Sequence, residues 1–342
     1  MSELVQIEPT VAEPVVHRNG MASGRSRAAY LFLRNRLLGR PRYVNIEVTL
    51  RCNARCDFCD YWKTGPMEVL DDYSPIVNKI DPLGVTLSGG EPLVRKDLAE
   101  VVRKLHDNCR LLFISINTHG GLLTLEKARE LRAAGLTNVT FSMDYPDERH
   151  QEARGIKGLW KHFHEVIPRM PQLGYKGVQV HAIISKKNFR DLPAITELAR
   201  RWGVRCSFTT FSYTKVGEKE YWIQPEEIPE LERILEEVIA LKRRYGHITN
   251  SDYYLRNVPE YFRYRRIDGC QAGKAWIHLS ANGFIKTCSE LPEVCHWTEY
   301  KPGIAWQTEC QNCWFKCRGE QQAPITPRRA YEYFQSYLRH TG

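Results

Sequence analysis

The chain has 342 residues, of which 42% are hydrophobic and 26% are charged, as in ordinary soluble globular proteins. It contains no run of about 18 or more apolar residues and no secretory signal, which argues against membrane-spanning and secreted disulfide-rich proteins. We therefore expect a cytoplasmic protein whose eleven cysteines are mainly metal ligands. The net charge of +9 favours an acidic substrate, a phosphate-rich partner or an anionic surface, with a basic protein that binds none of these as an equal alternative.

The N-terminal region divides into a tail and a helix. Residues 1–24 are rich in Glu, Pro, Val and Gly and lack a helical or strand period, which predicts a disordered tail. Residues 25–42 predict a basic amphipathic helix, in which Tyr30, Leu33 and Leu37 share one face. We expect this face to pack against its own domain, and a peripheral contact with an anionic membrane is the alternative.

Residues 43–215 alternate between short β-branched runs and helical patterns. The strand-like runs are 43–50, 84–88, 111–118, 138–143, 177–184 and 204–211. This alternation predicts βα units and a parallel sheet, and six units fit a partial (β/α)6 TIM-like barrel better than a closed barrel of eight strands. Chemistry in such barrels lies at the C-terminal ends of the strands, where this chain carries glycines, acids and cysteines.

The rest of the chain changes in character. Residues 216–269 predict a long linking helix, followed by a segment rich in Tyr and Arg. The helix has an apolar stripe of Ile228, Leu231, Leu235 and Val238. Residues 270–320 are irregular and cysteine-rich, as in a small domain held together by a metal, and residues 321–342 predict a C-terminal helix.

Three cysteines, Cys52, Cys56 and Cys59, lie within eight residues directly after the first predicted strand. Each iron of an iron–sulfur cube normally takes one thiolate, so three thiolates leave one iron open to a substrate or cofactor. The alternative is a zinc site that a distant ligand such as His119 completes.

The segment CNARCDFC follows the pattern CxxxCxxC, with Phe58 directly before the last cysteine. It resembles the signature of the radical S-adenosylmethionine (SAM) superfamily. The resemblance implies that Cys52, Cys56 and Cys59 hold a 4Fe–4S cluster whose open iron binds SAM. It also implies that one electron, from an external donor such as flavodoxin or ferredoxin, splits SAM into methionine and a 5′-deoxyadenosyl radical, which abstracts a hydrogen atom from the substrate.

Further positions match the same superfamily. Gly89, Gly90 and Glu91 belong to a GGEP segment, which implies that they border the methionine part of SAM; glycine lets backbone approach the ligand, and a carboxylate can accept from the ammonium. The resemblance also implies that Phe58 lies beside the adenine. Thr118 occupies the place of a family TNG segment that reads THG here, so His119 is a departure.

Three polar residues near the fourth predicted strand are further candidates. Ser142 and Arg154 match positions that contact SAM in maturase-type members, which implies that Arg154 pairs with the carboxylate of the cofactor. Asp144, at the same strand end, is a candidate contact of the ribose or the substrate.

The cysteine-rich segment contains a second candidate metal site. Cys270 and Cys288 flank a predicted hairpin with an Asn282–Gly283 turn. Their spacing, C-x12-G-x4-C, resembles the opening of SPASM and twitch domains, which implies an auxiliary 4Fe–4S cluster.

Downstream, the segment CQNCWFKC supplies Cys310, Cys313 and Cys317. With Cys295 the region has six cysteines, whereas two closed cubes need eight, so one auxiliary cluster is expected. The sequence leaves open which of the three is not a ligand, and a zinc site is the alternative. Cys109 and Cys206 are expected to be buried thiols outside both sites.

The sequence thus predicts a radical SAM enzyme of oxidoreductase or transferase type that oxidises, rearranges or joins a small molecule in a specialised biosynthetic pathway. A peptide or a lipid-linked substrate is the alternative. RNA modification has less support, because basic and aromatic residues near 253–266 are its only indication.

Overall fold

The computed structural model describes residues 24–65, 67–214, 217, 220–306, 309–324, 326, 327 and 329. The predicted disordered tail, apart from Gly24, and most of the predicted C-terminal helix lie outside the described residues. The last helix with described bounds is α11 (Lys316–Gln322), and Pro327 and Arg329 beyond it are also helical.

One twisted sheet organises the molecule, and its strands lie in the order β6-β5-β4-β3-β2-β1-β7-β8-β9. The strands are β1 (Tyr43–Thr49), β2 (Gly84–Gly89), β3 (Phe113–Thr118), β4 (Asn138–Ser142), β5 (Gly177–Ile184), β6 (Arg205–Thr210), β7 (Trp276–Leu279), β8 (Phe284–Lys286) and β9 (Glu293–His296). The first six strands are all parallel and do not close on themselves, which confirms the partial barrel. The six predicted strands match β1 to β6 to within two residues at each end.

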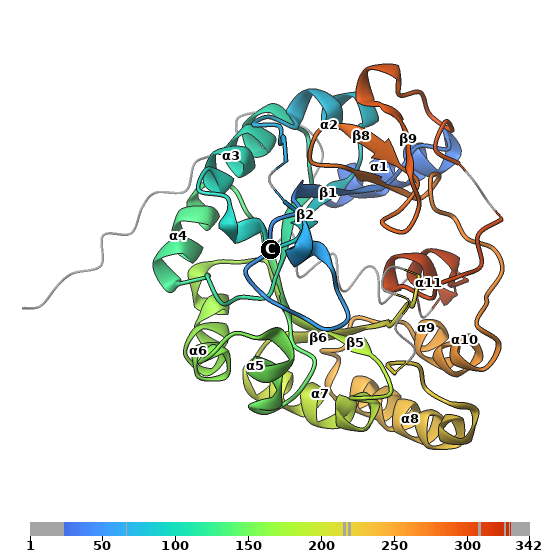
Figure 1. Ribbon diagram of the computed structural model, residues 1–342. Helices are drawn as coiled ribbons and strands as arrows, with labels where there is room; N and C mark the ends of the chain where they lie inside the picture. Colours follow the sequence, from blue (N-terminus) through green and yellow to red (C-terminus); the bar gives the residue numbers. More distant parts are fainter. Residues whose placement is uncertain are drawn as a thin grey trace, which may run out of the picture.

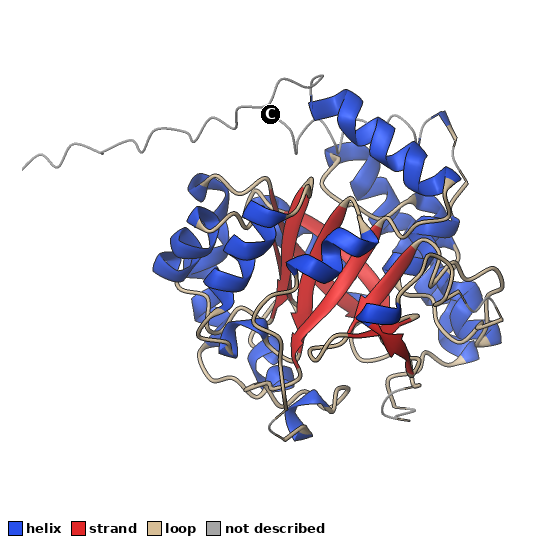
Figure 2. Ribbon diagram, turned by 90° about the horizontal axis from the view of Figure 1, so that it is seen from above, coloured by secondary structure: helices blue, strands red, loops and turns tan. Residues whose placement is uncertain are grey.

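Helices cover the outer face of the strands, as Figures 1 and 2 show. They are α2 (Ser74–Ile80), α3 (Leu98–Asn108), α4 (Leu125–Ala133), α5 (Arg149–Arg154), α6 (Leu159–Val166) and α7 (Leu192–Arg201). On β5, Val178, Val180 and Ala182 are buried in the core between sheet and helices. The residues between them, Gln179 and His181, bond to polar side chains of β4 and β6, so the inner face of the barrel is polar.

The C-terminal hairpin continues the barrel sheet instead of forming a separate one. Residues 43–46 of β1 pair in parallel with residues 276–279 of β7, and β8 and β9 follow in antiparallel order. Gly283 has φ +94° at the predicted turn, where a side chain would strain the backbone, so the Asn282–Gly283 hairpin is confirmed. The cysteine-rich region is therefore joined to the barrel through the strand that leads into the CxxxCxxC loop.

The opposite edge of the barrel, at β6, is covered by later parts of the chain. These parts include α8 (Ile228–Tyr245), α9 (Asp252–Arg256), α10 (Val258–Tyr264) and α11. The predicted stripe of Ile228, Leu231, Leu235 and Val238 on α8 is buried, as expected. Thr210 of β6 donates to the Trp314 carbonyl at 2.8 Å, and Trp314 stacks on Tyr254 with ring centroids 5.7 Å apart. The end of the cysteine-rich region is thereby fixed against the barrel.

Helix α1 (Gly24–Leu37) differs from its prediction. The face that includes Leu31 and Asn35 is buried, and the Asn35 amide donates to the carbonyls of Pro41 and Asp81 at 3.2 and 2.9 Å. Tyr30, Leu33 and Leu37 are exposed by 62%, 56% and 84%, so the expectation that this face packs on the domain is wrong. None of the helices that the structure describes is long and apolar enough to span a bilayer.

Candidate functional site

The CxxxCxxC loop follows β1 at the C-terminal ends of the parallel strands. The Ala54 backbone N–H points at the Cys52 sulfur (3.4 Å), and an Arg154 N–H points at the Cys56 sulfur (3.7 Å). Burial raises the pKa of Cys52 to about 11, and burial also raises the pKa of Cys56, where the Arg154 charge opposes the rise. Thiols in such surroundings become thiolates when a cationic metal centre supplies the compensating charge.

The two glycines of the GGEP segment let this segment lie directly against the cysteine loop. A Cβ atom on Gly89 would lie 2.0 Å from the Thr49 carbonyl oxygen, and one on Gly90 would lie 2.2 Å from that of Arg51. The Gly90 N–H donates to the Thr49 carbonyl at 2.8 Å. The close approach that these glycines permit is thus to the chain's own backbone, and it fixes the start of the cysteine loop.

Glu91 is completely buried and is held by three donors of the chain. Its carboxylate accepts from the Thr118 hydroxyl at 2.7 Å and from the backbone N–H groups of His119 and Leu93 at 2.8 and 3.0 Å. Burial raises the pKa of Glu91 to about 7, although these hydrogen bonds oppose the rise. Glu91 and Thr118 therefore join the ends of β2 and β3 to each other.

His119, the departure from the family pattern, connects this group to the cysteine loop. Its Nδ1 accepts from the Gly121 N–H at 3.0 Å, so the proton is on Nε2, which donates to the Asn53 side chain at 2.8 Å. Burial lowers the pKa of His119 to about 4, which keeps the ring neutral at pH 7. Because both ring nitrogens are occupied, His119 does not complete a zinc site with the three cysteines.

Arg154 and Asp144 form a buried ion pair beside the cysteine loop. Asp144 also accepts from the Ile183 N–H at 3.0 Å, and the Arg154 guanidinium lies over the Phe58 ring at 5.2 Å from its centroid. The expected partner was the cofactor carboxylate for Arg154 and the ribose or the substrate for Asp144, whereas in this structure the two residues pair with one another. The Arg154 Nε is nevertheless buried without a hydrogen-bond partner, which leaves one donor for a ligand carboxylate.

Ser142, the last residue of β4, is partly exposed and lies opposite His181 in the register of β5. Most of the sequence-predicted site residues therefore lie at one end of the barrel. They are the three cysteines, the GGEP segment, Thr118, Ser142, Asp144 and Arg154. Phe58 lies there too, with its ring edge-on to Tyr221 at 5.8 Å.

Below this end, polar side chains of neighbouring strands bond across the inner face of the barrel. His181 pairs with the Ser207 hydroxyl at 2.7 Å, and Asn45 accepts from Ser88 at 2.7 Å. Glu47 accepts from the Tyr61 hydroxyl at 2.8 Å. We name this polar inner face of the barrel the lumen. Its side chains were not predicted, although polar residues at every second position of the strands are the signal that identifies them.

Five cysteines line a cavity of about 60 Å³ beside the hairpin. They are Cys270, Cys288, Cys310, Cys313 and Cys317. Burial raises the pKa of Cys288 to about 12 and that of Cys313 to about 11, and neighbouring cysteines add to both shifts. Cys295 lies outside this cavity, on β9, where its surroundings include Glu299 and Lys79.

Residues 46–199 match the model of the Radical SAM superfamily, over the strands and loops that carry the cysteine loop, the GGEP segment and Arg154. The chain carries a radical SAM domain. The match confirms the sequence-based resemblance over this range, and the members of this superfamily are enzymes.

Relatives of this radical SAM protein differ in the reactions that their names describe. An AdoMet-dependent heme synthase of Methanosarcina barkeri is 26% identical over 277 residues, which cover 74% of this chain and 78% of the relative. A GTP 3',8-cyclase of Aquifex aeolicus is 33% identical over 201 residues, which cover 54% and 61%. Streptococcus suis SuiB bound to S-adenosylmethionine has the same fold, with a TM-score of 0.63 and 15% identity over 84% of this chain and 72% of SuiB.

Within the described residues, no group of three or more Cys, His, Asp or Glu side chains lies close enough to hold a single metal ion.

Proposed function

We propose that this enzyme holds a 4Fe–4S cluster on Cys52, Cys56 and Cys59, cleaves SAM reductively and abstracts a hydrogen atom from a substrate in the lumen. The observation that carries the proposal is the position of the three thiols above a polar lumen, beside the unpartnered Nε of Arg154. When bound, the cluster and SAM supply a 5′-deoxyadenosyl radical, which no side chain can generate unaided.

The residues around the cysteine loop would bind and orient the cofactor. The Arg154 Nε would donate to the cofactor's carboxylate, while Asp144 keeps the guanidinium in place. The Phe58 ring would offer an apolar face to the adenine. Four residues would act mainly by holding the cysteine loop in position, namely Gly89, Gly90, Glu91 and Thr118. Ser142 would lie at the edge of the cofactor.

We further propose that the C-terminal cysteine cavity holds one auxiliary 4Fe–4S cluster of SPASM or twitch type. Its support is the five cysteines that line one cavity, next to a hairpin whose cysteine spacing resembles these domains. Tyr61, two residues after Cys59, donates to Glu47, and Glu47 also pairs with Lys286, two residues before Cys288. A substrate in the upper lumen would thus be close to both clusters, as in members that oxidise their substrate.

The substrate that the lumen fits best is a small, polar and negatively charged molecule. The net charge of the chain is +9, and Lys286 reaches Glu47 on the inner face of the barrel at 3.6 Å. The names of the GTP 3',8-cyclases among the relatives agree with such a substrate class. A peptide is the alternative, because SuiB, with the same fold, has been solved with its precursor peptide.

The proposal predicts that the reconstituted enzyme, reduced with dithionite in place of a flavodoxin or ferredoxin, converts SAM into methionine and 5′-deoxyadenosine. Chromatography of the anaerobic reaction measures both products. Nucleotides and sugar phosphates should raise the yield at least ~10-fold over the substrate-free rate, since a substrate in place commits the radical to productive abstraction. No 5′-deoxyadenosine under any condition would refute the radical chemistry. Stimulation by short peptides, but not by phosphorylated metabolites, would refute the substrate class alone.

We also propose that the exposed face of α1 contacts an anionic membrane. Tyr30, Leu33 and Leu37 are solvent-exposed, and Arg36 lies exposed beside them, which is the pairing of apolar and basic residues that interfacial helices use. Such a contact would bring the enzyme close to lipid-linked compounds.

This contact predicts that the protein sediments with vesicles that contain phosphatidylserine. The double variant Leu33→Glu/Leu37→Glu should lose at least ~10-fold in vesicle affinity, because it removes buried apolar area and adds repulsive charge. Leu122→Glu is the control, since Leu122 is also exposed but lies between β3 and α4. Equal vesicle binding by all three proteins, or self-association through this face in sedimentation velocity, would contradict the membrane contact.

A further inference from the structure

One side of strand β7 forms a wall of the C-terminal cysteine cavity. Trp276 and His278 line this cavity, whereas the two residues that alternate with them are buried in the core of the barrel. Successive side chains of a strand point to opposite faces of the sheet, so the side chain of Trp276 is on the face that carries the cysteines. Trp276 also belongs to a small apolar cluster with Cys270, against which Cys288 packs.

The indole N–H of Trp276 is a buried donor without an acceptor. Trp276 is 5% exposed, and its Nε1 has no hydrogen-bond partner among the residues that the structure describes. An indole N–H can only donate, and leaving a buried donor unpaired costs free energy, so folded proteins rarely do so. We therefore expect an acceptor for this N–H within the cavity that Trp276 lines.

The backbone of Trp276 is fixed, so the indole cannot leave the cavity through a shift of the chain. The Trp276 carbonyl accepts from the Gly273 N–H at 2.8 Å, and Trp276 lies opposite Tyr43 in the register of β1. A Cβ atom on Gly273 would lie 1.9 Å from the Ala305 carbonyl oxygen, so the turn before β7 packs closely on the chain that follows. Strand and turn together hold the indole at the cavity wall.

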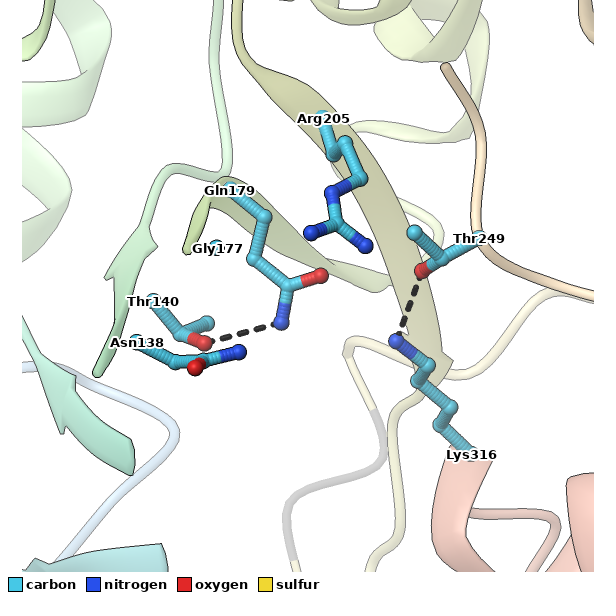
Figure 3. Close-up of a pocket in the computed structure, with 7 residues that line it drawn as sticks. All are labelled: Asn138, Thr140, Gly177, Gln179, Arg205, Thr249 and Lys316. Carbon is cyan, nitrogen blue, oxygen red and sulfur yellow. Dashed lines mark hydrogen bonds between the residues drawn. The ribbon is translucent and has the colours of Figure 1, made fainter. Parts of the chain in front are cut away.

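Another wall of the cavity is fixed to the barrel through Lys316, which lies between Cys313 and Cys317. The Lys316 ammonium donates to the Thr249 hydroxyl at 2.9 Å inside a separate polar cavity of about 200 Å³, as Figure 3 shows. Its backbone N–H donates to the Thr209 hydroxyl of β6 at 3.1 Å. The walls of the cysteine cavity are therefore attached to the first and the last strand of the barrel, and the fold sets their separation.

We propose that the Trp276 N–H donates a hydrogen bond to a sulfur atom of the auxiliary cluster and thereby raises the reduction potential of this cluster; the inference rests on the auxiliary cluster proposed above. The sulfur atoms of a thiolate-bound cluster carry negative charge, and one-electron reduction increases that charge. A donor beside them stabilises the reduced state more than the oxidised state, and hydrogen bonds to the sulfurs are among the factors that set cluster potentials. A higher potential favours electron transfer to the cluster.

Redox titration of the reconstituted full-length variant Cys52→Ala/Cys56→Ala/Cys59→Ala tests this inference, because all of its iron belongs to the auxiliary site. Trp276→Phe in this background keeps an aromatic ring in the wall and removes the N–H. At a fixed ambient potential, the ratio of reduced to oxidised cluster should fall at least ~10-fold, which corresponds to about 59 mV for a one-electron couple. Electron paramagnetic resonance of the reduced cluster measures this ratio.

Trp314→Phe in the same background is the matched control, since it removes an indole N–H directly beside Cys313. This N–H already donates to the Tyr254 carbonyl at 3.0 Å, so its loss should leave the potential of the cluster unchanged. Iron content and circular dichroism of each variant identify any that have failed to fold.

A second measurement needs no substitution in the cavity. Growth on ¹⁵N-indole labels only the indole nitrogens, and among the described residues Trp276 is the tryptophan that lines the cysteine cavity. Pulsed electron paramagnetic resonance of the labelled, reduced triple-alanine variant should detect a weakly coupled ¹⁵N nucleus, because a hydrogen bond places the indole nitrogen next to a cluster sulfur.

An unchanged ratio in Trp276→Phe, or no coupled ¹⁵N nucleus in the labelled protein, would overturn the hydrogen bond and leave the auxiliary cluster standing. An equal fall in Trp276→Phe and Trp314→Phe would also overturn it, since both effects would then come from a loosened wall. Little iron in the triple-alanine variant would instead refute the auxiliary cluster, and this inference with it. The radical site would be untouched by any of these outcomes.

Discussion

The triple variant Cys52→Ala/Cys56→Ala/Cys59→Ala is expected to form no 5′-deoxyadenosine and to retain about four irons per chain after anaerobic reconstitution. Removing all three thiolates leaves the radical cluster without protein ligands. The auxiliary cysteines line a different cavity, beside the hairpin of β7 and β8, and they should keep their cube.

Iron, sulfide and zinc counts per chain measure this outcome. The variant should fold, because the loop is held through backbone bonds such as that of the Gly90 N–H to the Thr49 carbonyl. Cys109→Ala is the control, since Cys109 follows α3 and belongs to neither site, and it should keep about eight irons. Little iron with about one zinc in the triple variant would show a structural zinc site instead, and the reaction would then need only the radical.

The six parallel strands were predictable because β-branched runs between helical patterns are a local signal. The pairing of β1 with β7 was not, because it joins residues more than 200 positions apart and no local pattern encodes it. The buried face of α1 was predicted wrongly for a different reason. The apolar stripe suggested the buried face, whereas the hydrogen bonds of Asn35 to two backbone carbonyls hold the other face inward.

At the site, the spacing of Cys52, Cys56 and Cys59 was informative because these three cysteines lie in one short loop. The role of Glu91 could not be predicted from the sequence. Its carboxylate was expected to face a ligand, but it accepts from Thr118 and His119 at the end of the next strand. The polar side chains of the lumen could have been predicted from the sequence, but they were not. Polar residues at every second strand position, such as Gln179 and His181, are a period-two signal that points inward in a barrel.

The structure also bears on which downstream cysteine is spare. Cys317 lines the cavity with an exposed side chain, and Cys313, Cys288 and Cys270 act on it electrostatically. Cys313 and Cys270 likewise act on Cys288. Cys310 lines the same cavity, and among the other four cysteines it acts on Cys270. We therefore propose Cys270, Cys288, Cys313 and Cys317 as the four ligands of the auxiliary cluster, with Cys310 as the spare thiol.

Single substitutions in the triple-alanine background, where all iron belongs to the auxiliary site, test this ligand set. Cys313→Ala should lose most of its roughly four irons to a chelator followed by gel filtration, because one iron has lost its thiolate and opens to exchange. Cys310→Ala should keep them, and its reduced cluster should give the same electron paramagnetic resonance spectrum as the background protein. If Cys310→Ala is the labile variant and Cys313→Ala or Cys317→Ala is not, the ligand set is wrong. The CxxC pair of Cys310 and Cys313 would then supply the two downstream thiolates, and Cys317 would be free to leave the cavity.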